Sequence, residues 1–242
     1  MNTLNPQSKK YRAVQMAAPL IDVLGWDIVN WSQALVLWEK VLPYDISNCR
    51  FLEIGAYSGG LSLWIAQKKG KIICSDFESP ERRAIILHKK WKIENAIFYE
   101  AIDATSIPYE NEFDFILFKS VLGAIGSQNH LESKKKAISE MHKALKPGGV
   151  LLYAENLEGS LFHRFFRKKY VRWGNTWSYA SIDEIKTLMG VFRENKFETT
   201  GFLGAFGRTH FQRNFLGILD QLIFCKLINK SNHYIIYGYA KK

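Results

Sequence analysis

The stretch FLEIGAYSGG, residues 51–60, places a carboxylate and three glycines at the end of an apolar run. The run has the character of a buried strand, and the residues from Ser58 onward have helical periodicity. In an open parallel sheet, ligands bind beyond the carboxyl ends of the strands, where the chain turns into a helix. Glycine permits positive φ there and lets backbone amides approach a ligand. The stretch therefore predicts either a tight strand-to-helix turn or the start of a ligand site.

The apolar periodicity on both sides of this stretch predicts the fold. From residue 50 onward, short apolar runs alternate with segments of helical periodicity, and FDFILF is almost continuously apolar, as in a strand covered on both faces. Strands are expected in RFLEI, KIICS, AIFYEA, FDFILF and VLLYAE, and helices over 58–69, 79–91 and 131–145, with Ser79-Pro80 opening the second helix. This alternation predicts a doubly wound, mostly parallel α/β sheet with helices on both faces.

The remaining parts of the chain are predicted to complete one domain over residues 1–242. Residues 1–48 are expected to form helices, with Asn30 capping WSQALVLWEKVL, and residues 49–156 to form the core. Residues 157–242 are expected to add a basic helix from Ser160 to Trp173, a capped helix from Ser181, a helix over 210–228, and the strands FETTGFLGAF and HYIIYGYA. The chain has no internal repeat and no long linker, which is why one domain is predicted.

Composition and charge restrict the class of protein. The formal net charge is +10, which favours acidic partners such as phosphates, nucleic acid or anionic lipid, although solubility alone explains it equally well. The cysteines Cys49, Cys74 and Cys225 are widely spaced without a CxxC pair, so we expect core thiols in a reducing cytosol and no metal site. The N-terminus lacks a signal-peptide core, and FLGILDQLIFC is interrupted by polar residues. We expect a cytoplasmic protein with at most peripheral membrane contact.

Carboxylates near three predicted strand ends narrow the class of ligand. Asp76 ends the second strand, 21 residues after Gly55, where a carboxylate can accept hydrogen bonds from a ribose diol. Asp103 ends the third strand, and Glu53 lies near the end of the first, where it either faces an amino group or orients the loop. The glycine spacing G-x-x-x-G-G differs from the nicotinamide fingerprint, and no Gly-Lys-Ser/Thr phosphate cradle follows. The set suits S-adenosylmethionine, which carries an amino acid, a ribose and an adenine.

Together these motifs resemble a class I S-adenosylmethionine-dependent methyltransferase with a type-11-like domain. The matching pieces are LEIGAYSGG, CSDF, AIDA, FDFILFKSVLGAIG and ALKPGGVLLYAE, in the expected order over residues 50–156. The resemblance implies S-adenosyl-L-methionine as cofactor and a Rossmann-like, seven-stranded sheet whose last strand, HYIIYGYA, runs antiparallel. It also implies a set of cofactor-binding residues around the methionine, ribose and adenine parts: Glu53, Gly55, Ala56, Tyr57, Gly59, Asp76, Phe77, Asp103, Ala104, Lys119 and Ser120.

One position departs from the family pattern. Where the family usually has a middle glycine, this chain has Tyr57, which either covers the cofactor or crowds it. A protein that binds the cofactor without catalysis, or that serves as the partner subunit of a methyltransferase, is therefore the alternative to an enzyme.

The catalytic group is sought among residues that follow the strand ends. Methyl transfer from a sulfonium is an in-line displacement, and a hydroxyl acceptor also needs a base. Glu155 is predicted as this base because the fifth strand ends beside the cofactor crevice in this fold. His130 and His163 are further candidates beyond the strand ends, although a solvated or structural role fits each histidine better on its own.

The expected acceptor is a small molecule or a glycan-type compound, and nucleic acid is disfavoured. The chain lacks the Asx-Pro-Pro-aromatic run of base-amine methylases, the Pro-Cys nucleophile of cytosine methylases and any appended RNA-binding motif, and an RNA methyltransferase is kept as an alternative. GSLFHRFFRKKYVRWG predicts either a core-packed helix with a solvated basic side or a lid whose Arg164 and Arg167 meet an anionic acceptor. This segment and residues 201–217 resemble parts of methyltransferase-like proteins from bacterial surface-polysaccharide gene clusters, which implies a bacterial role in polysaccharide biosynthesis. The oligomeric state is not predicted.

Overall fold

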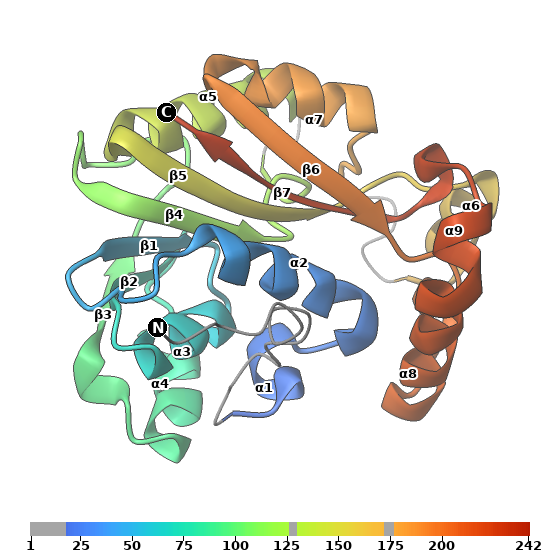
Figure 1. Cartoon of the computed structure of the whole chain (residues 1–242), viewed down its shortest axis with the longest axis horizontal. Coiled ribbons are helices and arrows are strands. Elements are labelled where there is room, and N and C mark those ends of the chain that lie inside the picture. Colours follow the sequence, from blue (N-terminus) through green and yellow to red (C-terminus); the bar gives the residue numbers. More distant parts are fainter. Residues whose placement is uncertain (1–17, 126–129, 172–176) are drawn as a thin grey trace, which may run out of the picture.

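The computed structural model describes residues 18–125, 130–171 and 177–242, and within them the chain forms a seven-stranded sheet in the order β3-β2-β1-β4-β5-β7-β6 (Figure 1). The strands from β1 to β5 are parallel, whereas β7 is antiparallel to both of its neighbours. The predicted doubly wound sheet with an antiparallel last strand is therefore confirmed. The strands are β1 Arg50–Ile54, β2 Lys71–Asp76, β3 Ile97–Ala101, β4 Phe113–Lys119, β5 Leu145–Asn156, β6 Glu194–Thr200 and β7 Ile235–Lys241.

Helices cover both faces of this sheet. Figure 1 shows α1 to α4 on one side and α5 and α7 on the other, while α6, α8 and α9 gather at one end of the molecule. A π-helical turn, Asp220–Phe224, joins α8 to α9. The α-helices of the described residues are α1 Leu20–Leu24, α2 Ile28–Val41, α3 Gly60–Gln67, α4 Glu81–Lys90, α5 His130–Ala144, α6 Leu161–Tyr170, α7 Ile182–Leu188, α8 His210–Leu219 and α9 Cys225–Leu227.

Alternate residues of β4 pack against opposite layers of helices. Leu117 lies in the core that contains Trp31 of α2, whereas Phe118 lies in the core that contains Met141 of α5. A strand covered on both faces needs apolar residues in both phases of its alternation, which explains the continuous apolar run. The alternation also turns the next residue, Lys119, toward the face that α2 covers, where its Nζ lies 4.6 Å from the centre of the Trp31 ring.

Several predicted helix boundaries are corrected by the structure. Asn30 does not cap α2, because the helix begins earlier, after Asp27, and Asn30 lies buried in its first turn. Ser79 does not cap α4, since Pro80 occupies the position before Glu81 and the cap has no side-chain hydrogen bond. The end of the predicted basic helix, at Trp173, lies outside the described residues. None of the helices described over 18–125, 130–171 and 177–242 is long and apolar enough to cross a membrane.

The corrected position of Asn30 places it in a buried polar cluster that joins α2 to the C-terminal part of the chain. Its side-chain amide donates to Asp220 at 2.9 Å and lies 3.2 Å from both Asp27 and the Tyr234 hydroxyl. Tyr234 in turn donates to Asp27. Asp220 also accepts the backbone N–H of Gly204 at 2.9 Å. This cluster fixes α8 against α2, and with it the end of the molecule where α6 lies.

Candidate functional site

The glycine corner after β1 has the geometry that its sequence predicts. Gly55 and Gly59 have φ angles of +67° and +74°, in the left-handed region that side chains disfavour. A Cβ atom at Gly55 would lie 2.5 Å from the Val121 side chain, and one at Gly59 would lie 2.6 Å from the His88 ring. Conformation and space therefore both require glycine at these positions. The corner brings backbone amides to the carboxyl edge of the sheet, where β1 lies between β2 and β4.

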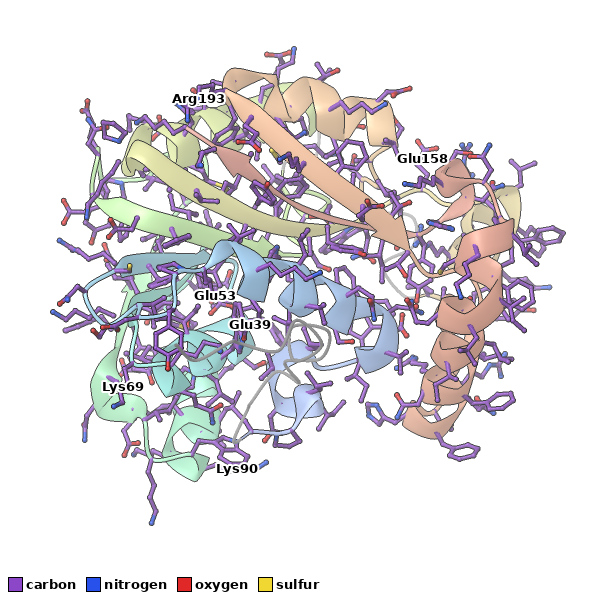
Figure 2. All side chains as sticks on the ribbon, in the orientation of Figure 1. Glu39, Glu53, Lys69, Lys90, Glu158 and Arg193 are labelled. Atoms are coloured by element: carbon purple, nitrogen blue, oxygen red, sulfur yellow. The ribbon has the colours of Figure 1, made fainter. Side chains whose placement is uncertain are left out.

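Glu53 orients this corner from inside the molecule. Its carboxylate accepts the backbone N–H of Ser62 at 2.8 Å and also the Ser62 hydroxyl, so it holds the first turn of α3 against β1. Figure 2 shows Glu53 in the interior, between the sheet and the helices α2 and α3. Burial raises the pKa of Glu53 to about 7, against the opposing effects of the Ser62 hydrogen bonds. Of the two roles predicted for Glu53, the geometry supports orientation of the loop.

Asp76 ends β2 and Asp103 follows the end of the neighbouring strand β3. Asp76 accepts the backbone N–H of Tyr57 at 2.9 Å and that of Phe77 at 2.8 Å. Asp103 follows β3, pairs with Thr105 at 2.8 Å, and is exposed. Since a carboxylate has about four acceptor sites, Asp76 retains capacity for a ribose diol. Phe77 is 73% exposed beside this pair. The residues at this edge therefore fit a nucleoside with a free diol, such as that of S-adenosylmethionine.

Tyr57 adopts the backbone conformation that a glycine would otherwise supply. Its φ angle is +51°, and its ring is 66% exposed with the Arg83 guanidinium 4.8 Å from the ring centre. The ring therefore packs on the start of α4, and the strained backbone, which costs about 1–2 kcal/mol for a side-chain-bearing residue, is held by the hydrogen bond to Asp76.

We expect Tyr57→Gly to change the affinity for S-adenosylmethionine by less than about threefold, because the exposed ring buries little surface and glycine relieves the strain. Isothermal titration calorimetry of the folded variant measures this directly. A tenfold or greater loss of affinity would show that the ring closes over the cofactor, which contradicts the geometry described here.

Lys119 ends β4 as a lysine without a polar partner. Its ammonium lies against the Trp31 ring and has no hydrogen bond or ion pair with any other residue in the described part of the chain. Burial lowers the pKa of Lys119 to about 8, and the nearby carboxyl groups of Glu155, Glu53 and Asp27 act in the opposite direction. The side chain thus has an amine that titrates close to neutral pH at the edge of the sheet beside the glycine corner.

Glu155, the residue predicted as the base, is buried and has both carboxylate oxygens occupied. One oxygen accepts the backbone N–H groups of Val121 at 2.8 Å and Leu122 at 2.7 Å, and the other accepts that of Asn156 at 2.8 Å. Burial raises the pKa of Glu155. Ser120, which precedes this loop, has a φ angle of +57° and accepts from the Asn156 amide at 2.7 Å. The geometry gives Glu155 the role of shaping the loop after Lys119, and its catalytic role stays a prediction.

Of the two histidine candidates, the structure describes the side chain of His163 but not that of His130. His163 is buried with both ring nitrogens partnered, Nδ1 by the Ser160 hydroxyl at 2.8 Å and Nε2 by the Phe202 carbonyl at 2.8 Å. Burial lowers the pKa of His163 to about 4, so the ring is neutral near pH 7. It completes the capping box of α6. His130 begins α5, but its side chain lies outside the described part of the chain. A catalytic role for either residue stays a prediction.

The two arginines predicted on the acceptor side point in different directions. Arg164 is exposed and forms an ion pair with Glu158. Glu158 is labelled in Figure 2 near the end of the molecule where α6 lies. Arg167 is buried, donates to the backbone carbonyls of Leu157 at 2.7 Å and Glu158 at 3.0 Å, and lies 3.9 Å from the centre of the Tyr179 ring. Arg167 therefore fastens α6 to the end of β5, whereas only Arg164 presents its charge to solvent.

We expect Arg167→Ala to lower the free energy of unfolding by about 2–3 kcal/mol, because it removes one buried and one partly buried hydrogen bond from a charged donor, together with one ring contact. The matched variant Arg164→Ala, which loses only an exposed ion pair, should change it by less than about 0.5 kcal/mol. Chemical denaturation of both variants measures the difference. Equal effects would contradict a structural role specific to Arg167.

Comparison with known proteins identifies the family. Residues 45–196 match a family model described as a methyltransferase domain. The ubiquinone/menaquinone biosynthesis C-methyltransferase of Wigglesworthia glossinidia brevipalpis is 29% identical over 130 residues, which cover 49% of this chain and 48% of that protein. The chain thus spans about half the length of the curated relative that it matches.

Solved structures share the fold. Phosphoethanolamine N-methyltransferase 2 of Haemonchus contortus, solved with S-adenosyl-L-methionine, is 20% identical with a TM-score of 0.62, over 88% of this chain and 52% of that one. The [4+2]-cyclase SpnF is 16% identical with a TM-score of 0.56, over 87% and 79% of the two chains. Since the family model covers more than half of the sequence, this chain belongs to the methyltransferase-domain family.

Proposed function

We propose that this protein transfers a methyl group from S-adenosylmethionine to a small-molecule or glycan-type acceptor, and that Lys119 is the catalytic base. The observation that carries the proposal is the placement, at the carboxyl end of β4 beside the glycine corner, of a lysine that has no hydrogen bond or ion pair with the residues the structure describes. In the sheet, β4 lies between β1 and β5, with Phe118 opposite Ile54 and Lys119 opposite Ala154. Lys119 is therefore level with the residue that follows Ile54, which is Gly55.

The proposed chemistry uses this amine to remove a proton. When bound, S-adenosylmethionine supplies an electrophilic methyl group on a sulfonium. The neutral Lys119 amine takes the proton of an acceptor hydroxyl or ammonium, and the freed oxygen or nitrogen can then attack in line. A general base of this kind contributes typically 10²–10⁴-fold, and a lysine becomes suitable when burial lowers its pKa toward 7–8. Burial lowers the pKa of Lys119 to about 8, which meets this condition.

The acceptor is proposed to be anionic. The formal net charge of +10 attracts negatively charged compounds to the protein. The similar fold of Haemonchus contortus phosphoethanolamine N-methyltransferase 2 has been solved with phosphomonomethylethanolamine, which is a small phosphorylated acceptor. A sugar phosphate or glycan conjugate combines such a charge with hydroxyl groups, and a role in polysaccharide biosynthesis is the narrower form of this proposal.

A screen for methyl transfer tests the proposal. The protein is incubated with S-adenosylmethionine and, separately, nucleotide sugars, lipid-linked glycans, phosphorylated amines and RNA, and release of S-adenosylhomocysteine is measured. We expect turnover with an anionic glycan or another phosphorylated small molecule. Labelling of RNA alone would overturn the acceptor class while leaving the cofactor site in place.

The rival function is binding of the cofactor without catalysis of methyl transfer. One of the similar structures gives a specific reason to retain this rival. The SpnF structure shows that this fold also carries a cyclase, so the fold alone does not determine the reaction. Binding of S-adenosylmethionine without turnover of any acceptor, in the presence or absence of candidate partner proteins, would favour this rival over the proposed transferase.

A further inference from the structure

The exposed apolar side chains of this protein are concentrated on three elements at one end of the molecule. Figure 1 shows these elements, α6, α8 and α9, together at this end, away from α4 and β3 at the other edge of the sheet. More than half of the large apolar side chains that are exposed in the described residues belong to them and to the turn between α8 and α9: Leu161, Phe162, Phe165, Tyr170, Phe211, Phe215, Ile218, Leu222, Ile223 and Leu227.

Ring contacts place α6 beside the segment from α8 to α9 with opposite chain directions. Near the start of α6, His163 contacts the Phe202 ring at 5.1 Å, and Phe202 stacks on Phe224 at 6.3 Å. Near the end of α6, the Arg208 guanidinium lies 5.7 Å from the centre of the Tyr170 ring. Both ends of α6 are thus tied to the C-terminal helices. The exposed residues of α6 and of residues 208–230 form what we name the α6–α9 surface.

The spacing on α8 shows that its apolar stripe faces away from the protein core. Phe211, Phe215 and Ile218 of α8 and Leu222 of the π-helical turn that continues it recur at intervals of four, three and four residues, as on one face of a helix, and all four are exposed. The opposite face is the buried one, since Gly217 lies against Val29 of α2. An apolar stripe of a surface helix normally packs on the core. Here it is left without a partner in the described part of the chain.

Cations outnumber acids around these apolar residues, and two of the cations have an acidic partner: Arg164 pairs with Glu158 and Lys230 with Glu198. Within 160–170 and 208–230, the sequence has a single acidic residue, Asp220, which is buried in the polar cluster with Asn30. The ammonium of Lys169 lies 5.9 Å and 5.4 Å from the centres of the Phe165 and Tyr170 rings. The exposed cations of this surface are Arg164, Lys168, Lys169, Arg208, Lys226 and Lys230.

We propose that the α6–α9 surface binds an anionic lipid bilayer, with its aromatic and aliphatic side chains in the interface and its cations at the phosphates. Helices that lie in a membrane interface combine a large apolar face with an opposite face rich in Lys and Arg. Exposed basic residues near a membrane add about 1 kcal/mol each, which corresponds to about fivefold in partitioning. The inference does not depend on methyl transfer, because it concerns a surface on the outer side of α8, away from Lys119.

Charge complementarity favours lipid over the other occupants of an apolar surface. The N-terminal residues 1–17 carry Lys9, Lys10 and Arg12 and no acidic residue, so they would be repelled by the cations of this surface. A second copy of the chain would bring the same cations face to face. An anionic headgroup layer offers apolar depth and negative charge together.

Vesicle co-sedimentation of the full chain tests the proposal. The probes are vesicles of phosphatidylcholine alone and of phosphatidylcholine with about a third phosphatidylglycerol, at low and at high salt. We expect binding to the anionic vesicles, weakened by salt, and at least about fivefold weaker binding to the neutral ones. Phe211→Ser with Phe215→Ser should weaken binding about tenfold or more, and Lys168→Gln with Lys169→Gln by about twentyfold.

The matched control is Ile86→Ser with Phe98→Ser, which removes two apolar side chains that are 72% and 68% exposed on α4 and β3. This control should bind vesicles like the unmodified protein. Circular dichroism and the affinity for S-adenosylmethionine confirm that all variants fold. The proposal is overturned if the unmodified protein does not bind anionic vesicles, if it binds neutral ones equally, or if the control weakens binding as much as the α8 variant. Loss of a dimer in the α8 variant, with no vesicle binding, would assign the surface to a second copy instead.

Discussion

Replacing Lys119 with methionine is expected to lower kcat by about 10²–10⁴-fold while S-adenosylmethionine still binds. Methionine keeps much of the length and apolar contact of the lysine side chain against Trp31 but has no amine to accept a proton. Steady-state kinetics with an acceptor found in the screen, together with calorimetric titration of the cofactor, separates the two effects. Lys71→Met is the matched control and should keep full activity, because Lys71 begins β2, at the opposite edge of the sheet from the end of β4, and β1 lies between the two strands.

The pH dependence of the same reaction distinguishes a base from a cation that only binds the acceptor. The pKa of Lys119 is lowered by burial to about 8, so the neutral amine becomes abundant as the pH rises through 8. If Lys119 is the base, kcat rises with pH and levels off above about 8, and Lys119→Arg loses this rise along with the activity. A rate that falls above pH 8, with activity retained in Lys119→Arg, would mean that the ammonium binds an anion and would contradict the assignment.

Asp76→Ala should weaken S-adenosylmethionine binding by about one to two orders of magnitude. Hydrogen bonds from a ribose diol to a carboxylate are charge-assisted and worth roughly 1.5–3 kcal/mol, and 1.4 kcal/mol corresponds to tenfold in Kd. The substitution also frees the backbone N–H of Tyr57, which Asp76 accepts at 2.9 Å, so the corner loses one of its supports.

Calorimetric titration of the Asp103→Ala variant with S-adenosylmethionine, measured in parallel with Asp76→Ala, provides the comparison for this prediction. Asp103 is exposed, and an adenine amine offers it only a neutral donor, so we expect a smaller loss of affinity. Unchanged affinity in a folded Asp76→Ala variant would remove Asp76 from the cofactor site. A larger effect at Asp103 than at Asp76 would reverse the assignment of ribose and adenine.

Local signals in the sequence were sufficient to predict the sheet and the glycine corner. The continuous apolar run of β4, the glycines at 55 and 59 and the acids at 76 and 103 each reflect a requirement that acts within a few residues: burial on both faces, positive φ, or a strand end. The corner and both acids accordingly lie where the spacing predicts them. The seven-stranded sheet with an antiparallel last strand was implied by the resemblance to a family and is confirmed.

The features that the sequence could not predict depend on contacts between residues that are far apart in the chain. Asn30 resembles a helix cap, but it is buried against Asp220 and Tyr234, which lie far along the chain. Trp31 lies in phase with Trp38 on the buried face of α2, so periodicity assigns it to the core and gives no sign that it contacts Lys119.

The polar candidates show the same limit. Glu155 and Arg167 are residue types that often act in active sites. Here their side chains form hydrogen bonds with backbone groups of neighbouring segments, and no sequence pattern predicts those contacts. By contrast, the resemblance implied Lys119 as one of the cofactor-binding residues, and its lack of a polar partner in the described part of the chain became visible once the surrounding elements were in place.

Calorimetric titration of the full chain with S-adenosylmethionine and with S-adenosylhomocysteine tests the central claim most directly, because every step of the proposed methyl transfer depends on a cofactor at the glycine corner. The account predicts that both compounds bind with dissociation constants in the micromolar range or below, and that Asp76→Ala weakens both in parallel. Absence of binding by either compound at high micromolar concentration, with folded protein, would contradict the account.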